Sequence, residues 1–223
     1  EYALAGKLLK GDLTLTSNLL NANQLTGTDT TTQKPADDAP LEAPQVPANI
    51  DFSFSTTIKK ILYDTYTLDN FTGSVIVKDR TAQLTGLSFR TFGGLFRASA
   101  KYATPEKALP QAAMAFQVDS LDINKTYTQL EIAQKFLPIV KDVSGRVNVN
   151  MSMNLALKEN LDPVYPSING LGMFFITEGK VGKVAIMDKI NEATKLNLFN
   201  DFYLKDTKLN FAIRDGRIFF DPF

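Results

Sequence analysis

The most regular feature of this sequence is an alternation of apolar and polar residues with a period of two. It is clearest over residues 147–157, where every second residue is apolar and the residues between them are mostly Asn and Ser. Such alternation is typical of a β-strand with one face in the protein interior and the other in water. Similar segments recur through most of the chain and predict about ten strands, most of them antiparallel neighbours.

Two stretches of the chain, residues 66–87 and 202–223, repeat the same phrase of strand, two-residue break and strand. The breaks are Asp79-Arg80 and Asp215-Gly216. Asp-Gly is a favoured pair for the tight turn whose twist matches that of the flanking strands. We therefore expect two hairpins that are apolar on one side only. In the second hairpin the predicted facing pairs are Ile213 with Ile218 and Phe211 with Phe220.

A third turn is predicted at Phe92-Gly93-Gly94, with the loop centred on the two glycines. This placement pairs Leu87 with Ala100, Phe89 with Ala98 and Thr91 with Phe96. The apolar residues change from even to odd positions shortly before this turn, which predicts a β-bulge near Gly86.

The apolar period changes to three or four residues after Ile123, which predicts an amphipathic helix with Asn124 as its N-cap. The helix is expected to run through residues 124–140, where Pro138 ends or kinks it. A second short helix is predicted at about residues 183–196, with Met187, Ile190 and Thr194 on one face.

The chain divides into three parts. Residues 1–27 resemble the end of an upstream β repeat, and residues 28–49 are rich in Pro, Thr and Asp and predict a disordered or loosely attached loop. Residues 50–223 form the main β domain. The sequence has no initiator methionine and opens within a strand-like segment, so we expect a piece of a longer protein whose membrane anchor lies outside this chain.

The predicted fold is mainly β (α+β): a large antiparallel meander sheet with two short amphipathic helices. Ten strands make a sheet about 45–50 Å wide, and two helices of about 10 Å diameter cover only part of it. The remaining apolar face could be covered by closure into a barrel, by folding over as a sandwich, or by a ligand held in a trough. We expect a sheet strongly curved into a groove or a partly closed barrel.

Composition argues against several classes of function. The chain has 24 Lys+Arg and 24 Asp+Glu with no basic run, so no nucleic-acid partner is expected. His and Cys are absent, which removes imidazole bases, thiolates and the usual zinc ligands. No Ser-x-x-Lys phrase is present, and Asp119 and Asp122 are an unconvincing carboxylate pair. We therefore predict no enzyme, no catalytic residue, no metal site and no cofactor.

The apolar faces remain as the candidate site. Methionines suit surfaces that accept flexible chains as well as irregular cores. The residues predicted to line a lipid groove are Phe89, Phe96, Met114, Phe116, Val149, Met151, Met153 and Met173. The same residues would also serve an ordinary core, because a sealed core and an open trough need the same alternation.

Several structural phrases in the sequence resemble the C-terminal region of the AsmA family of the Gram-negative envelope, including its Bacteroidetes-type members. They are the Asp-x hairpins, Phe92-Gly93-Gly94 followed by Lys101-Tyr102, the predicted helix leading into Gly145-Arg146-Val147, and Asp215-Gly216-Arg217-Ile218. The resemblance covers residues 50–223 well and residues 1–27 loosely. It carries no catalytic residues to this chain.

This resemblance implies a periplasmic β-rich body tethered to the inner membrane by one N-terminal helix outside this chain. The wider group, with its TamB-like relatives, resembles bridge-like lipid transfer proteins with a long apolar β-groove. The expected partner is thus a phospholipid or another acyl-chain lipid, together with envelope proteins. The alternative is a periplasmic scaffold or cap that binds envelope proteins through its sheet edges.

Overall fold

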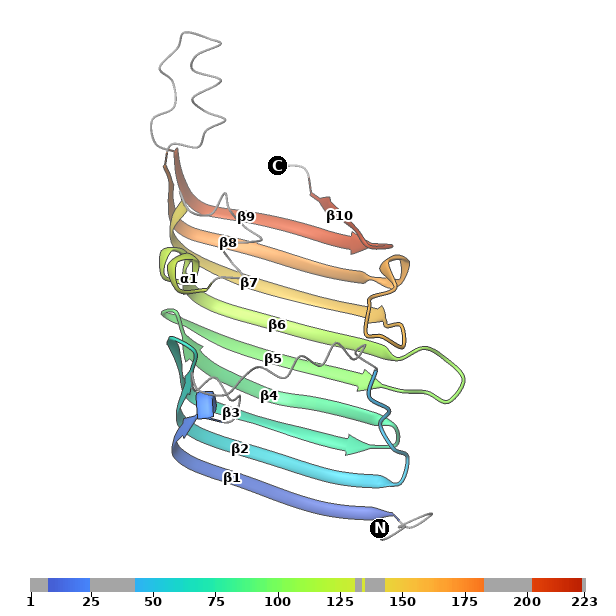
Figure 1. Ribbon diagram of the computed structural model, residues 1–223. Helices are drawn as coiled ribbons and strands as arrows, with labels where there is room; N and C mark the ends of the chain where they lie inside the picture. Colours follow the sequence, from blue (N-terminus) through green and yellow to red (C-terminus); the bar gives the residue numbers. More distant parts are fainter. Residues whose placement is uncertain (1–7, 25–42, 131–133, 135–142, 183–201, 222–223) are drawn as a thin grey trace, which may run out of the picture.

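The computed structural model describes residues 8–24, 43–130, 134, 143–182 and 202–221 of the chain. Within them the protein is mainly β, and its strands form a single ten-stranded sheet in the order of the sequence (Figure 1). Its strands are β1 (Leu9–Asn21), β2 (Ile50–Tyr63), β3 (Tyr66–Lys78), β4 (Thr81–Thr91), β5 (Gly94–Ala103), β6 (Gln111–Asp122), β7 (Val143–Ala156), β8 (Asn169–Val181), β9 (Phe202–Arg214) and β10 (Arg217–Phe220). The sheet is not closed into a barrel, because β1 and β10 lie at its two edges.

Strands β2 to β10 form the predicted antiparallel meander, whereas β1 pairs with β2 in parallel. The described part of residues 1–27, the region that resembles the end of an upstream β repeat, contains β1 and the short 3-10 helix η1 (Ala22–Gln24). Parallel pairing requires the chain to return to the starting end of β1 before β2 begins. Local alternation carries no information about such a return.

The hairpin predictions are largely confirmed. Ile213 faces Ile218 and Phe211 faces Phe220 around Asp215-Gly216, and Val77 faces Ala82 around Asp79-Arg80. All four turn residues have positive φ, as a turn of this hand requires. The bulge near Gly86 is also present, as a register shift between Leu84 and Leu87.

The predicted register of the third hairpin was wrong by two residues. The loop is Phe92-Gly93, and Thr91 pairs with Gly94, Phe89 with Phe96 and Leu87 with Ala98. Phe92 has a positive φ of 48°, whereas the prediction expected positive φ at Gly93 and Gly94. A shift of two residues keeps each side chain on its face, so the apolar side of the hairpin is unchanged.

One α-helix is described, α1 (Ile123–Gln129), at the end of β6. Its N-cap is Asp122, whose carboxylate accepts a hydrogen bond from the Lys125 N–H at 3.0 Å; Asn124 was predicted in that role. The predicted run through residue 140 was wrong at Leu130, which is extended with φ −115° and ψ 102° and ends α1. Most of the remaining stretch to residue 140 and the whole second predicted helix lie outside the described residues. A 3-10 turn, η3 (Tyr165–Ser167), precedes β8. No helix in the described ranges is long and apolar enough to span a bilayer.

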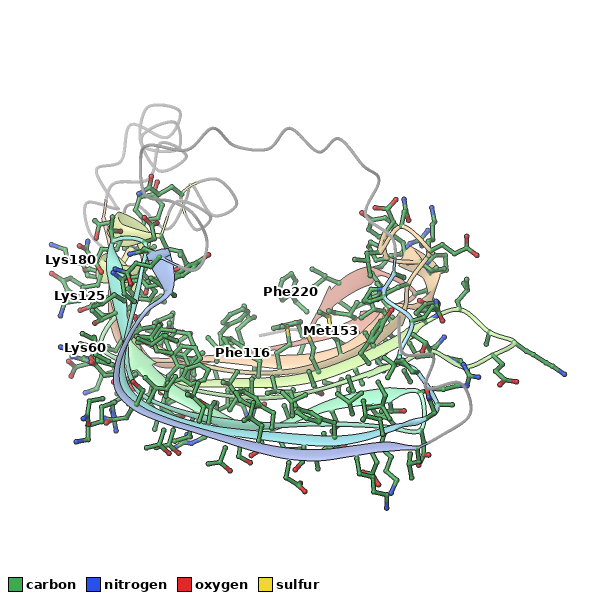
Figure 2. The ribbon with its side chains drawn as sticks, turned by 60° about the horizontal axis from the view of Figure 1, so that its bottom comes forward. Lys60, Phe116, Lys125, Met153, Lys180 and Phe220 are labelled. Carbon is green, nitrogen blue, oxygen red and sulfur yellow. The ribbon has the colours of Figure 1, made fainter. Side chains whose placement is uncertain are left out.

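The sheet bends, and this divides its surface into two sides (Figure 2). Phe116, Met153 and Phe220 lie on the inner side of the bend, and Lys60 lies on the outer side. Paired residues of neighbouring strands share a side, so the strand register assigns the other residues to one side or the other. We call these two sides the inner face and the outer face.

Residues 43–49 precede β2 and form hydrogen bonds with Thr104 and Glu159, which lie in two other loops. The sequence predicted that this segment would be disordered or loosely attached. Ala43 and Val46 are buried, and the Val46 N–H donates to the Thr104 hydroxyl at 3.0 Å. The Thr104 N–H donates to the Arg80 carbonyl at 2.9 Å. Thr104 is 1% exposed and therefore links this segment to the β3–β4 turn from a fully buried position.

Replacing Thr104 with valine is expected to lower the free energy of unfolding by about 1–3 kcal/mol, because the buried Val46 N–H would lose its acceptor. Thr104→Ser keeps the hydroxyl and serves as the control. Urea unfolding of the full chain measures both variants. Equal stability of the valine and serine variants would show that this hydrogen bond does not hold the segment in place.

Candidate functional site

An uninterrupted apolar row crosses the inner face from one edge of the sheet to the other. Each strand contributes one residue, and each residue pairs directly with the next: Leu13, Phe54, Val75, Leu84, Ala100, Met114, Met153, Gly170, Ile213 and Ile218. Ten strands spaced by about 4.8 Å give this row a length of about 45 Å. We call it the inner row.

Two aromatic series run beside the inner row. Phe71, Phe89, Phe96 and Phe116 contact one another from β3 to β6, with successive ring centroids 5.9, 5.1 and 5.9 Å apart. Phe174, Phe211 and Phe220 continue from β8 to β10, at 5.3 and 6.2 Å. Cross-strand aromatic pairs of this kind stabilise a sheet and also present continuous ring surface.

Glycines on β8 make room for this surface. A Cβ atom on Gly172 would lie only 2.1 Å from the nearest carbon of the Phe211 ring, so the ring lies directly over the backbone of β8. A Cβ atom on Gly170 would lie 2.5 Å from the Ser152 carbonyl oxygen and 2.9 Å from the Met153 Cβ, so β7 approaches β8 closely there. The Phe211 ring therefore occupies the space above β8 that a side chain at position 172 would fill.

Seven of the eight predicted lining residues lie on this inner face. They are Phe89, Phe96, Met114, Phe116, Val149, Met151 and Met153. The eighth, Met173, does not: it pairs with Asn150 and Asn210 on the outer face, while its neighbour Phe174 points inward. Alternation along β8 forces this result, since adjacent residues of a strand point to opposite faces.

Phe71 and Phe174 also belong to this surface and were not among the predicted lining residues. Phe174 follows the same alternation that excludes Met173, so the pattern along β8 was a sufficient signal. Phe71 was harder to assign, because Asn70 has positive φ and the pairing of β3 with β4 is irregular there. Such an irregularity changes the phase of the alternation.

The inner face carries no charged residue at any strand position that the register assigns to it. Polar groups there are few and neutral. Tyr102 donates its hydroxyl to the Pro44 carbonyl at 3.1 Å, and burial raises the pKa of this phenol. The phenol therefore stays uncharged throughout the physiological range.

Among the described residues, charge lies on the outer face, at the strand ends and in the loops. Lys10 and Lys78 flank Asp51 at 3.8 and 3.2 Å, and each comes from a neighbouring strand. On the other half of the sheet, a hydrogen bond from Gln117 and then one from Arg97 lower the pKa of Asp119. These are exposed ion pairs of modest energy, and they mark the face that water covers.

Little of the inner face is covered by other described parts of the chain. Helix α1 packs near the ends of β6 and β7, where Ile123 and Val118 are buried. Elsewhere on the inner face Ile58, Ile61, Leu155 and Phe211 are buried, while most remaining side chains are half-exposed and Met114 is exposed. An apolar surface of this extent can hold apolar molecules.

Comparisons with known proteins add no relative to this picture. No protein-family model, no curated protein and no solved structure matches the chain.

Proposed function

We propose that this chain is a non-enzymatic periplasmic domain of an AsmA-like envelope protein. In this proposal its inner face is an apolar β-groove that takes part in phospholipid transport between membranes and in outer-membrane assembly. The tether to the inner membrane is expected in a segment outside this chain. The envelope setting rests on the resemblance of the hairpin phrases, and the lipid partner rests on the inner face.

The observation that carries the proposal is the inner row, which is apolar in every strand and lies on a face with no charged residue at its strand positions. Burial of hydrocarbon contributes about 0.8 kcal/mol per methylene. Ten methylenes laid along the row would contribute about 8 kcal/mol, which corresponds to a dissociation constant of about 1 µM before ordering costs. A row crossing all ten strands is long enough for such a chain.

Photo-crosslinking in cells tests the lipid partner. A photoreactive amino acid at Phe116 or Met151 is expected to capture lipid, because both residues lie on the inner face. The matched positions are Gln117 and Ser152, their immediate neighbours on the outer face, which should capture none. Lipid at all four positions, or at none, would contradict binding by this face.

A scaffold that pairs through a sheet edge is the second candidate, and the edge strand β1 favours it. β1 is 13 residues long, contains no proline, and exposes Leu9, Leu13 and Leu15. Long edges of this kind offer unpaired backbone groups to another strand. Photoreactive groups at Thr14 or Thr16 should then capture protein, whereas Phe116 and Met151 should capture no lipid if this is the only activity.

A further inference from the structure

Two arginines face each other across the β9–β10 hairpin. Arg214 and Arg217 are a directly opposed pair in the strand register, on the outer face beside the Asp215-Gly216 turn. Both are exposed, and among the described residues neither forms an ion pair, although Asp215 and Asp221 are close in sequence. Like charges directly opposite each other on a sheet are destabilising. An anionic group bound between them would relieve this repulsion.

The same hairpin exposes large apolar side chains on both faces. Ile218 and Phe220 belong to the inner face, Phe219 belongs to the outer face, and each is between 47% and 59% exposed. Leu171, on the outer face of β8, is 66% exposed, and Tyr165, in η3 next to the Asp215-Gly216 turn, is 67% exposed. Phe219 and Leu171 pair with the same residue, Ala212, and the Tyr165 carbonyl lies against Gly216.

The arginines and the apolar side chains are physically joined. The Arg214 guanidinium lies over the Phe219 ring, 5.8 Å from its centroid. A cation stacked on an aromatic ring keeps its charge while its flat face stays out of water. The hairpin thus combines an apolar part and a cationic part within one small surface.

We propose that the β9–β10 hairpin is a docking element for an anionic lipid bilayer surface. A protein that packs against a sheet covers only one of its faces. On β10, however, the consecutive residues Ile218, Phe219 and Phe220 expose apolar side chains on both faces. A hairpin inserted into the interfacial zone of a bilayer is in contact with lipid on both faces. This zone accommodates aromatic side chains together with arginines. Lipid phosphates supply the anion for Arg214 and Arg217, and the hydrated headgroup region satisfies the free backbone groups of β10.

This inference goes beyond the proposed function and is independent of acyl-chain binding by the inner face. It concerns the β10 edge of the sheet, where the inner row ends at Ile218. If both proposals hold, the docked hairpin places one end of the inner row at a membrane surface.

Cosedimentation of the full chain with vesicles tests the docking. The vesicles are phosphatidylcholine alone, or phosphatidylcholine with about one third phosphatidylglycerol. We expect binding to the mixed vesicles that weakens with salt, and a loss of about tenfold in Arg214→Gln/Arg217→Gln. Lys78→Gln/Lys101→Gln removes the same charge from the outer face elsewhere and should leave binding within about twofold.

The apolar part is tested with Phe219→Ser. This variant should lose about tenfold in binding to the mixed vesicles, because the apolar ring that enters the bilayer interface is removed. Ile76→Ser is the matched control, since Ile76 is an apolar outer-face residue of β3 with 43% exposure against 47% for Phe219. No binding by the unmodified chain, or equal binding by all variants, overturns the proposal.

The outcome is separable from that of the proposed function. Loading with a fluorescent fatty acid delivered from cyclodextrin needs the inner face and no bilayer, and Arg214, Arg217 and Phe219 are all on the outer face. Normal loading without vesicle binding rejects the docking element alone. Vesicle binding without loading rejects the lipid groove alone.

Discussion

Gly145→Ala is expected to lower the free energy of unfolding by about 3 kcal/mol or more. Gly145 has a φ of +124°, a region that residues with a Cβ atom rarely adopt. Its added Cβ would lie 2.2 Å from the Glu178 carbonyl oxygen and 2.8 Å from the Gly179 Cα. Both atoms belong to the backbone of β8, so no side-chain rotation removes the clash.

The matched control is Gly86→Ala. Gly86 also has a positive φ, +61°, but no atom lies within 4 Å of its added Cβ. It should therefore show the backbone cost alone, about 1 kcal/mol. Urea unfolding of the two variants separates the clash from the strain. If Gly145→Ala is no more destabilising than Gly86→Ala, β7 and β8 do not approach as closely as their register requires.

The strands and two of the three hairpins could be predicted because their determinants are local. Period-two alternation assigns each side chain to a face, and an Asp-Gly or Asp-Arg break between two alternating segments sets the register. The turn at Phe92-Gly93 shows the limit of this signal. Three consecutive candidate turn residues allow registers that differ by two, and alternation is the same in each.

The parallel pairing of β1 could not be predicted from local pattern. Its position depends on contacts distant in sequence, such as the hydrogen bond from the Leu9 N–H to the Asn49 carbonyl at 2.8 Å. Residues 43–49 likewise owe their order to Thr104 and Glu159. The composition of a segment shows how much apolar surface the segment itself can bury. It gives no information on hydrogen bonds to residues distant in sequence.

The candidate site was predictable at the level of faces and less so at the level of individual residues. Alternation along the strands correctly assigns seven of the predicted residues to the inner face. Met173 was included because it is a methionine, although alternation along β8 assigns it to the outer face. The role of Gly170 and Gly172 required the structure. In sequence they only weaken a strand, whereas in the sheet Gly170 lies close to the β7 backbone and Gly172 lies beneath the Phe211 ring.

Ala100→Asp is expected to weaken the binding of a fluorescent fatty acid by at least about tenfold. Ala100 lies in the middle of the inner row, between Leu84 and Met114. A bound acyl chain would have to cover the new carboxylate. The free-energy cost of burying this unpaired charge exceeds the gain from apolar packing around one side chain. Aspartate is also too short to carry its charge out to water, unlike lysine or arginine.

Ser99→Asp places the same carboxylate one residue away on the same strand, but on the outer face, where Ser99 is exposed. The two variants share any cost of aspartate in a strand, so a difference in binding between them reports on the face alone. Fluorescence titration gives the affinities, and thermal unfolding confirms that both variants are folded. Equal affinities would place the bound chain away from the inner row. A loss confined to Ala100→Asp would mean that acyl chains bind over the middle of the inner row, beside Leu84 and Met114.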